Sequence, residues 1–220
     1  MSRVKLRRVY ATGGRPVDNT APGAKAGIRR YVLSLLAAEG ILLPPVLDCF
    51  CGQGIMWRQA YHRTPAYLRL DERRMDDARS TILCDNRRFL RHASTDLDRY
   101  ALFDIDAYGF PHEQLALICA RLTWRCYPVV GIVLTDAANV ASEKNAVQNG
   151  TLKYLGISRH RGGHVWGGMR RELLDLVIQK TCQDAHASAE QVRYLEAEGK
   201  RGTSAPLYIG YLMRHQPSQV

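Results

Sequence analysis

The stretch Val46–Gly54, which reads VLDCFCGQG, constrains the fold more than any other part of this chain. Its first half, Val46–Phe50, is a short apolar run that follows two prolines, so it is predicted as a buried strand. Gly52 and Gly54 allow positive φ and let another molecule approach the backbone closely. Residues 55–61 contain no helix breaker and are predicted as a helix. Strand, Gly-x-Gly turn and helix form the first unit of a nucleotide-binding α/β sheet.

A second acid supports this interpretation. Residues 67–71 are predicted as a strand that ends at Asp71, 17 residues after Gly54. An acid at this distance from the glycines accepts hydrogen bonds from ribose hydroxyls. The phosphate-binding form of the turn carries a third glycine, but Trp57 stands at that position, which leaves less room for a pyrophosphate. The alternative is an α/β domain with an ordinary glycine turn.

The pattern Asp48-x-Phe50-x-Gly52-x-Gly54 resembles the first motif of S-adenosylmethionine-dependent methyltransferases. That cofactor has an amino-acid tail and no phosphates. The resemblance implies that these four residues and Asp71 bind S-adenosylmethionine. It also implies an α/β fold of the Rossmann-like class I methyltransferase type, with a mostly parallel seven-stranded sheet and an antiparallel last strand.

The order of the predicted elements suits such a sheet, because strands alternate with helices up to the fifth strand and a helix and two strands close the chain. Further strands are predicted over residues 82–86, 100–106, 128–136, 191–195 and 207–213, and helices over 25–39, 72–79, 112–124 and 169–185. In the methyltransferase fold the end of the third strand lies beside the adenine of the cofactor. Asp85 and Asn86 are therefore candidates to contact the adenine ring edge, although a plain strand-to-helix loop explains them equally well.

The strongest chemical signal lies at the end of the fourth predicted strand, where Asp104, Asp106 and Tyr108 stand close together. Ligands bind open α/β sheets at the carboxyl ends of their strands. A carboxylate there can accept the hydrogens of an aromatic amine, and a tyrosine can hold the plane of a base. These three residues are the candidate catalytic residues for methyl transfer to such an amine, and structural carboxylates at a strand end are the alternative.

The segment Asp104–Pro111, DIDAYGFP, resembles the fourth motif of the tRNA N2,N2-dimethylguanosine methyltransferases, with Ala107 where that family has proline. Leu134–Ala138 and the helix from Arg170 are similar to later segments of the family. The resemblance implies guanine N2 in tRNA as the substrate, with Asp106 on the amine and Tyr108 against the base. The chain is expected to lack the family's additional C-terminal domain, since 220 residues leave no room for it.

Charge points to the partner. The formal net charge is +10 and the pI is about 9.5, a balance that favours a polyanionic partner such as nucleic acid. The resemblance of the segment Asp104–Pro111 to a guanine-type motif implies RNA more than DNA. The basic residues come in pairs, among them Arg29-Arg30. Residues 137–168 are predicted as an extended insert that binds substrate. Its candidate nucleic-acid contacts, with the helix residue that follows, are Arg159, Arg161, His164, Trp166 and Arg170. The alternative is a basic surface without a partner.

Composition sets the remaining expectations. We expect a basic N-terminal arm over residues 1–24 and one methyltransferase domain over 25–220. No apolar run approaches the roughly 20 residues that span a bilayer, and no secretory signal is recognised, so a cytoplasmic protein is expected. The six cysteines lack zinc-site spacing and are predicted as buried reduced thiols without a metal.

The sequence thus predicts an S-adenosylmethionine-dependent methyltransferase that acts on a base amine of nucleic acid. Two alternatives stay open: a DNA amino-methyltransferase or small-molecule methyltransferase on the same fold, and a nucleic-acid-binding module without turnover. The acids Asp48, Asp71 and Asp106 favour an enzyme, because a binding module has no need of them.

Overall fold

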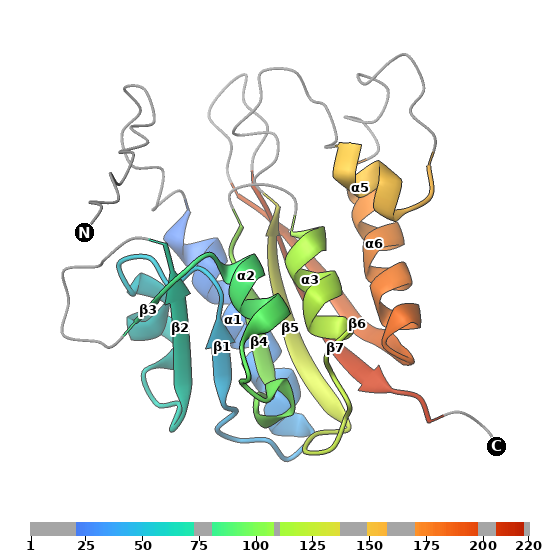
Figure 1. The fold of residues 1–220 in the computed structure, drawn as a ribbon. Helices are drawn as coiled ribbons and strands as arrows, with labels where there is room; N and C mark the ends of the chain where they lie inside the picture. The colour runs from blue at the N-terminus through green and yellow to red at the C-terminus, as the bar shows by residue number, and fades with distance from the viewer. Residues whose placement is uncertain are drawn as a thin grey trace, which may run out of the picture.

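The computed structural model describes residues 21–72, 81–107, 111–136, 149–157, 170–197 and 206–217 (Figure 1). The expected N-terminal arm lies outside the described residues as far as residue 20. Within the described ranges, no helix combines the length and the apolar character that crossing a membrane requires.

Seven strands form one sheet in the order β3-β2-β1-β4-β5-β7-β6. Strands β1 to β5 pair in parallel, and β7 runs antiparallel between β5 and β6. This arrangement confirms the predicted fold class, including the hairpin that inserts the last strand. The strands are β1 (Val46–Asp48), β2 (Tyr67–Asp71), β3 (Ile82–Leu83), β4 (Leu102–Ile105), β5 (Val129–Asp136), β6 (Ala187–Glu196) and β7 (Leu207–His215).

Helices cover both faces of the sheet (Figure 1). Helices α2, α3 and α6 lie on one face and α1 on the other, and each face has its own apolar core. Burial of these two cores is the main force that holds the layers together. The helices are α1 (Pro22–Ala38), α2 (Asn86–His92), α3 (His112–Cys119), α5 (Asn149–Tyr154) and α6 (Arg170–Asp184), with short turns η1 (Trp57–Tyr61) and η2 (Leu97–Arg99).

Two glycines let α1 approach the sheet closely. A Cβ on Gly131 of β5 would lie 2.5 Å from a methyl group of Val32, and a Cβ on Gly210 of β7 would lie 2.6 Å from the other methyl group of Val32. Neither distance is possible for real atoms, so both positions require glycine. The close packing brings the polar side chains near the start of α1 within reach of β4.

Several boundaries differ from the predictions. Helix α1 begins at Pro22, three residues early, because proline suits the first helical position. Helix α3 ends at Cys119 and not at residue 124, because the Asp98 carboxylate accepts the backbone N–H groups of Thr123 and Trp124. Part of the predicted extended insert is helical and forms α5. The predicted helix over 72–79 lies almost wholly outside the described residues.

The predicted burial of the cysteines is confirmed for most of them. All six thiols are free, and Cys49, Cys51, Cys119 and Cys182 are buried. Cys126 is exposed, contrary to the prediction, because it lies in the loop between α3 and β5.

Candidate active site

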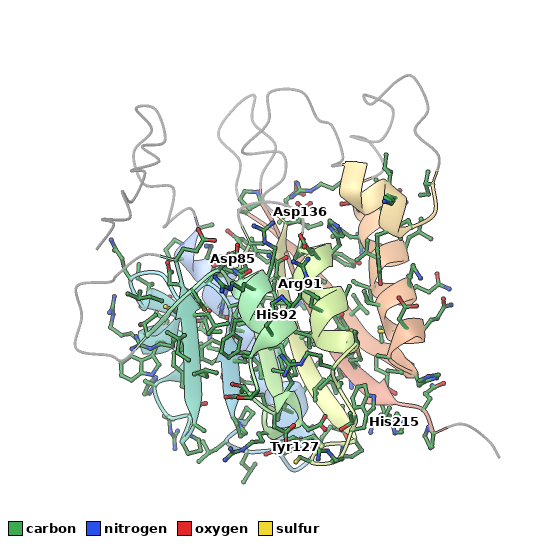
Figure 2. All side chains as sticks on the ribbon, viewed as in Figure 1. Asp85, Arg91, His92, Tyr127, Asp136 and His215 are labelled. Atoms are coloured by element: carbon green, nitrogen blue, oxygen red, sulfur yellow. The ribbon has the colours of Figure 1, made fainter. Side chains whose placement is uncertain are left out.

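The predicted site residues that the structure describes lie toward the carboxyl ends of the parallel strands. Figure 2 shows Asp85 and Asp136 at this end of the sheet, and Tyr127 and His215 at the opposite end. Asp85 follows β3 and Asp136 ends β5, so the two mark the outer limits of the site along the sheet. Open α/β sheets bind their ligands at this edge.

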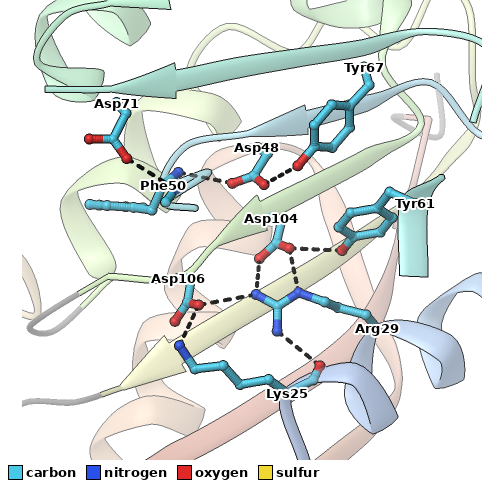
Figure 3. Close-up of polar contacts among 10 residues, drawn as sticks. Lys25, Arg29, Asp48, Phe50, Tyr61, Tyr67, Asp71, Asp104 and Asp106 are labelled. Carbon is cyan, nitrogen blue, oxygen red and sulfur yellow. Dashed lines mark hydrogen bonds and ion pairs between the residues drawn. The ribbon is translucent and has the colours of Figure 1, made fainter. Parts of the chain in front are cut away.

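The glycine turn after β1 has the predicted form. Gly52 and Gly54 adopt φ values of 46° and 70°, a region that glycine occupies without steric cost. The Gly52 N–H donates to a carboxylate oxygen of Asp71 at 3.1 Å, and the Phe50 N–H donates to Asp48 at 3.0 Å (Figure 3). Two residues that the sequence separates by 19 positions therefore meet, since the acid that ends β2 holds the turn that follows β1.

This turn fits the cofactor that the sequence implies. The nearest atom to a Cβ built on Gly52 is the Phe50 carbonyl oxygen, 4.0 Å away, so the protein leaves space beside the turn. Asp71 is half-buried at its rim and offers a carboxylate to hydroxyl donors. An open backbone turn beside one acid suits a nucleoside that carries an amino-acid tail. The residues that would hold S-adenosylmethionine are thus Phe50, Gly52, Gly54 and Asp71.

Asp48 lies beneath this turn and is buried. Its carboxylate accepts hydrogen bonds from the Phe50 N–H and the Tyr67 hydroxyl, and in the sheet register it lies directly beside Asp104. Burial raises the pKa of Asp48 and the Asp104 charge raises it further, to about 7, although both hydrogen bonds lower it. Asp48 therefore supports the turn from below, and its contact with a cofactor stays a prediction.

Asp104 is fully buried, which corrects its predicted role as a catalytic residue. Arg29 of α1 donates to both its carboxylate oxygens, through Nε at 2.6 Å and Nη2 at 2.8 Å. The Tyr61 hydroxyl donates a third hydrogen bond at 2.8 Å (Figure 3). A carboxylate with no exposed surface and three internal donors cannot reach a substrate, so Asp104 anchors α1 to the sheet.

Asp106 lies two residues after Asp104, directly beyond the carboxyl end of β4, and its side chain keeps 14% of its surface exposed. Lys25 donates to its Oδ2 atom at 2.7 Å, and Arg29 lies 3.4 Å from the same atom. Burial alone would raise the pKa of Asp106, but Arg29 and Lys25 outweigh it and lower the pKa below its ordinary value. Asp106 is thus an ionised acceptor that a substrate can reach. Its expected partner Tyr108 lies outside the described residues.

The two candidates after β3 have different environments. Asp85 caps helix α2 by accepting the Arg88 N–H at 3.1 Å, and it remains partly exposed. Asn86 is buried, donates to the Cys49 carbonyl at 3.1 Å and accepts from Gln114 at 3.2 Å. Its amide therefore links the end of β1 to α3, which corrects its predicted contact with an adenine ring. The contact of Asp85 with an adenine ring edge stays a prediction.

Most of the residues predicted to contact nucleic acid lie outside the described residues, namely Arg159, Arg161, His164 and Trp166. Arg170 begins α6 and donates to both the carboxylate and the carbonyl of Asp136 at the end of β5. This ion pair holds the start of α6 to the end of β5, and a phosphate contact of Arg170 stays a prediction. The two arginines of the Arg29-Arg30 pair also differ in exposure, because Arg29 is buried and Arg30 is exposed.

Sequence reasoning missed the residues that hold the acids. Hydrogen-bond donors to Asp48, Asp104 and Asp106 come from three elements: Lys25 and Arg29 of α1, Tyr61 of η1, and Tyr67 of β2. A signal was present for the two cations: they are four residues apart, and Arg29 adjoins the apolar stripe of α1. The tyrosines gave no signal, because a buried tyrosine is most often a core residue.

Comparisons with known proteins support the fold. No family model and no curated protein matches the chain. Among solved structures, it is similar to the plantazolicin methyltransferase BamL in complex with a triazolic analog and SAH, with a TM-score of 0.52 and 12% identity over 89% of this chain and 86% of that one. It is also similar to M. jannaschii TYW2 in complex with AdoMet, with a TM-score of 0.48 and 12% identity over 79% and 70%. A third is the N-methyltransferase NodS from Bradyrhizobium japonicum WM9, with a TM-score of 0.47 and 11% identity over 88% and 97%.

At these identities the likeness concerns the fold alone. With the strand order, it shows that the chain has a Rossmann-like fold of the kind found in class I S-adenosylmethionine-dependent methyltransferases. Because no family model matches, the tRNA guanine-N2 methyltransferase family remains a resemblance of short motifs.

Proposed function

We propose that this protein is an S-adenosylmethionine-dependent methyltransferase that methylates an exocyclic base amine in nucleic acid, most specifically guanine N2 in tRNA or another RNA. The observation that carries the proposal is the pairing of two features on neighbouring strands. An open glycine turn tied to Asp71 follows β1, and an ionised, reachable acceptor, Asp106, follows β4. One feature suits the methyl donor and the other suits the amine.

The register supports this division of roles. Asp48 of β1 pairs with Asp104 of β4, so the cofactor turn and the segment that holds Asp106 leave the sheet from neighbouring strands at the same end. S-adenosylmethionine supplies an electrophilic methyl group when bound. The amine of a base is a poor nucleophile, because its lone pair is delocalised into the ring. The Asp106 carboxylate would accept an amine hydrogen, orient the nitrogen and localise that lone pair.

The lowered pKa of Asp106 refines this chemistry. A carboxylate flanked by two cations is a weak base but a well-fixed negative acceptor. Its main contribution would therefore be to orient the amine and stabilise positive charge that develops on the nitrogen. After methyl transfer the substituted nitrogen is acidic, and its proton would pass to solvent water.

The charge of the chain supports a nucleic-acid partner. The net charge is +10, and Arg87, Arg88 and Arg91 are exposed on α2, which begins beside the cofactor turn. Glu113 pairs with Arg87 and Arg91. Arginines near the rim of the site suit phosphates. RNA is favoured because the motif at residues 104–111 resembles a guanine-type motif.

Calorimetry tests the cofactor half of the proposal. The protein is expected to bind S-adenosylmethionine and S-adenosylhomocysteine, and not nicotinamide or flavin dinucleotides. Asp71→Ala removes the acceptor for ribose hydroxyls and is expected to weaken binding by about 1.5–3 kcal/mol. Glu72→Ala removes the neighbouring exposed acid and serves as the control. Tight dinucleotide binding without a response to S-adenosylmethionine would refute the assignment.

A further inference from the structure

Helix α1 brings two cations to the end of β4. Lys25 and Arg29 are one helical turn apart and point to the same side, toward Asp104 and Asp106 (Figure 3). Arg29 also donates through Nη1 to the Lys25 carbonyl at 2.9 Å, so each guanidinium nitrogen has a partner. Two cations thus meet two carboxylates in one cluster. The cluster spans 81 residues of sequence between Lys25 and Asp106.

The two cations have separable tasks. Arg29 and Asp104 are 1% and 0% exposed and form a bidentate ion pair, which is the anchor between helix and sheet. Removing either would leave an uncompensated buried charge. Lys25 and Asp106 are 15% and 14% exposed, so their ion pair lies at the rim, within reach of a substrate. This second ion pair is less buried than the first, so its removal is expected to cost less stability than removal of Arg29.

The contact between Lys25 and Asp106 is nonetheless well defined. The Nζ–Oδ2 distance is 2.7 Å, and Arg29 contacts the same oxygen at 3.4 Å. A lysine side chain loses much rotamer freedom when it is held in this way. A fixed ammonium on one side of a carboxylate sets the direction in which the carboxylate can accept another donor, and it keeps the carboxylate ionised.

We propose that Lys25 is a positioning residue that orients the Asp106 carboxylate and holds it ionised for the amine of the substrate. The inference rests on the proposed function for its purpose, but the contact itself can be tested without turnover. Arg29 fixes the end of β4 through Asp104. Lys25 then sets the orientation and the ionisation state of Asp106, the proposed acceptor for the substrate amine. Lys25 acts through Asp106 and has no contact of its own with the reacting atoms.

Carbon-13 NMR of labelled aspartate carboxyl groups measures the effect directly, with Asp106→Asn to assign the signal. In Lys25→Met the Asp106 titration is expected to move up by about one pH unit or more, because an opposite charge has been removed. Lys25→Arg restores the charge and is expected to titrate like the parent. Arg30→Met removes an exposed cation from the same helix and is the matched control. An unchanged Asp106 titration in Lys25→Met overturns the proposal.

Kinetics then separate positioning from a general structural role. Lys25→Met is expected to lower kcat for methyl transfer about tenfold or more and to change the affinity for S-adenosylmethionine by less than about twofold. In an Asp106→Asn background the same substitution is expected to change kcat by less than about twofold, because Lys25 has lost the group through which it acts. An equal effect in both backgrounds overturns the proposal. If the parent protein shows no methyl transfer, the proposed function is wrong. The NMR titration then still tests whether Lys25 sets the pKa of Asp106.

Discussion

At the scale of single residues, four aspartates that look alike in sequence have four different environments. Asp71 holds the glycine turn, Asp48 is buried beside Asp104, and Asp106 alone combines partial exposure with bound cations. The differences arise from register and from the donors of α1, η1 and β2. Asp106 is therefore the aspartate best suited to contact a substrate, because cations stabilise its negative charge while its side chain stays partly exposed.

The raised pKa of Asp48 predicts that the free energy of unfolding depends on pH. Its pKa is raised by burial and by Asp104, to about 7 from an ordinary 3.8, and the nearby groups are the Tyr67 hydroxyl, the Phe50 N–H and Arg29. The folded protein therefore binds this proton more tightly than the unfolded chain does. The stability that Asp48 contributes in its protonated form is lost as the pH rises through about 7. The loss is on the order of 4 kcal/mol at most.

Asp48→Asn cannot titrate, so its stability is expected to fall less than that of the parent between about pH 4 and about pH 8. Denaturant unfolding across this range measures the difference. The absolute stability also changes, because asparagine loses one hydrogen bond, and only the slope with pH is diagnostic. Glu172→Gln, which removes an exposed acid from α6, serves as the control. Parallel curves for Asp48→Asn and the parent would contradict this account.

At the scale of elements, the seating of α1 on the sheet decides the geometry of the site. Gly210 of β7 faces Ile28 and Val32, and a Cβ there would lie 2.6 Å from a Val32 methyl group and 2.9 Å from Ile28. Both side chains are β-branched and stiff, so they cannot turn away. The helix itself would have to shift, and with it the anchor between Arg29 and Asp104.

Gly210→Ala is therefore expected to lower the free energy of unfolding by about 1–3 kcal/mol, as overpacking does. Gly27→Ala is the matched control on α1, because a Cβ at Gly27 meets only Leu195 at an ordinary 3.6 Å. This control is expected to raise stability by about 0.5–1 kcal/mol, since alanine is the better helix residue. Chemical denaturation of both variants checks the pair. Equal stability of Gly210→Ala and the parent would show that α1 is not tightly seated.

The elements also show what the sequence could predict. Strands β2, β5 and β7 were predicted nearly to the residue, because their apolar runs are bounded by clear breaks. The end of α3 was missed, because Asp98 lies 25 residues before Thr123 and only the fold brings them together. The same reason applies to the site: Asp106 was predicted from a local motif, whereas the Lys25 and Arg29 partners come from 81 and 75 residues away.

At the scale of the whole molecule, the strand order places both halves of the proposed chemistry at one edge. Strand β1 leads into the cofactor turn, and its neighbour β4 is followed by Asp106, to which Lys25 of α1 donates. The chain as a whole is basic, with a formal net charge of +10. The proposal of a methyltransferase that acts on a base amine in nucleic acid rests on the fold, on the residues at the carboxyl ends of β1 and β4, and on the net charge.

Transfer of a tritium-labelled methyl group from S-adenosylmethionine, measured for the parent and for Asp106→Asn on RNA, DNA and free nucleosides, tests this claim most directly. The parent is expected to label RNA, and Asp106→Asn is expected to do so about 10²–10⁴-fold more slowly with its cofactor affinity preserved. Transfer by Asp106→Asn at the parent rate, or a parent that binds the cofactor and labels none of the acceptors, would contradict the account.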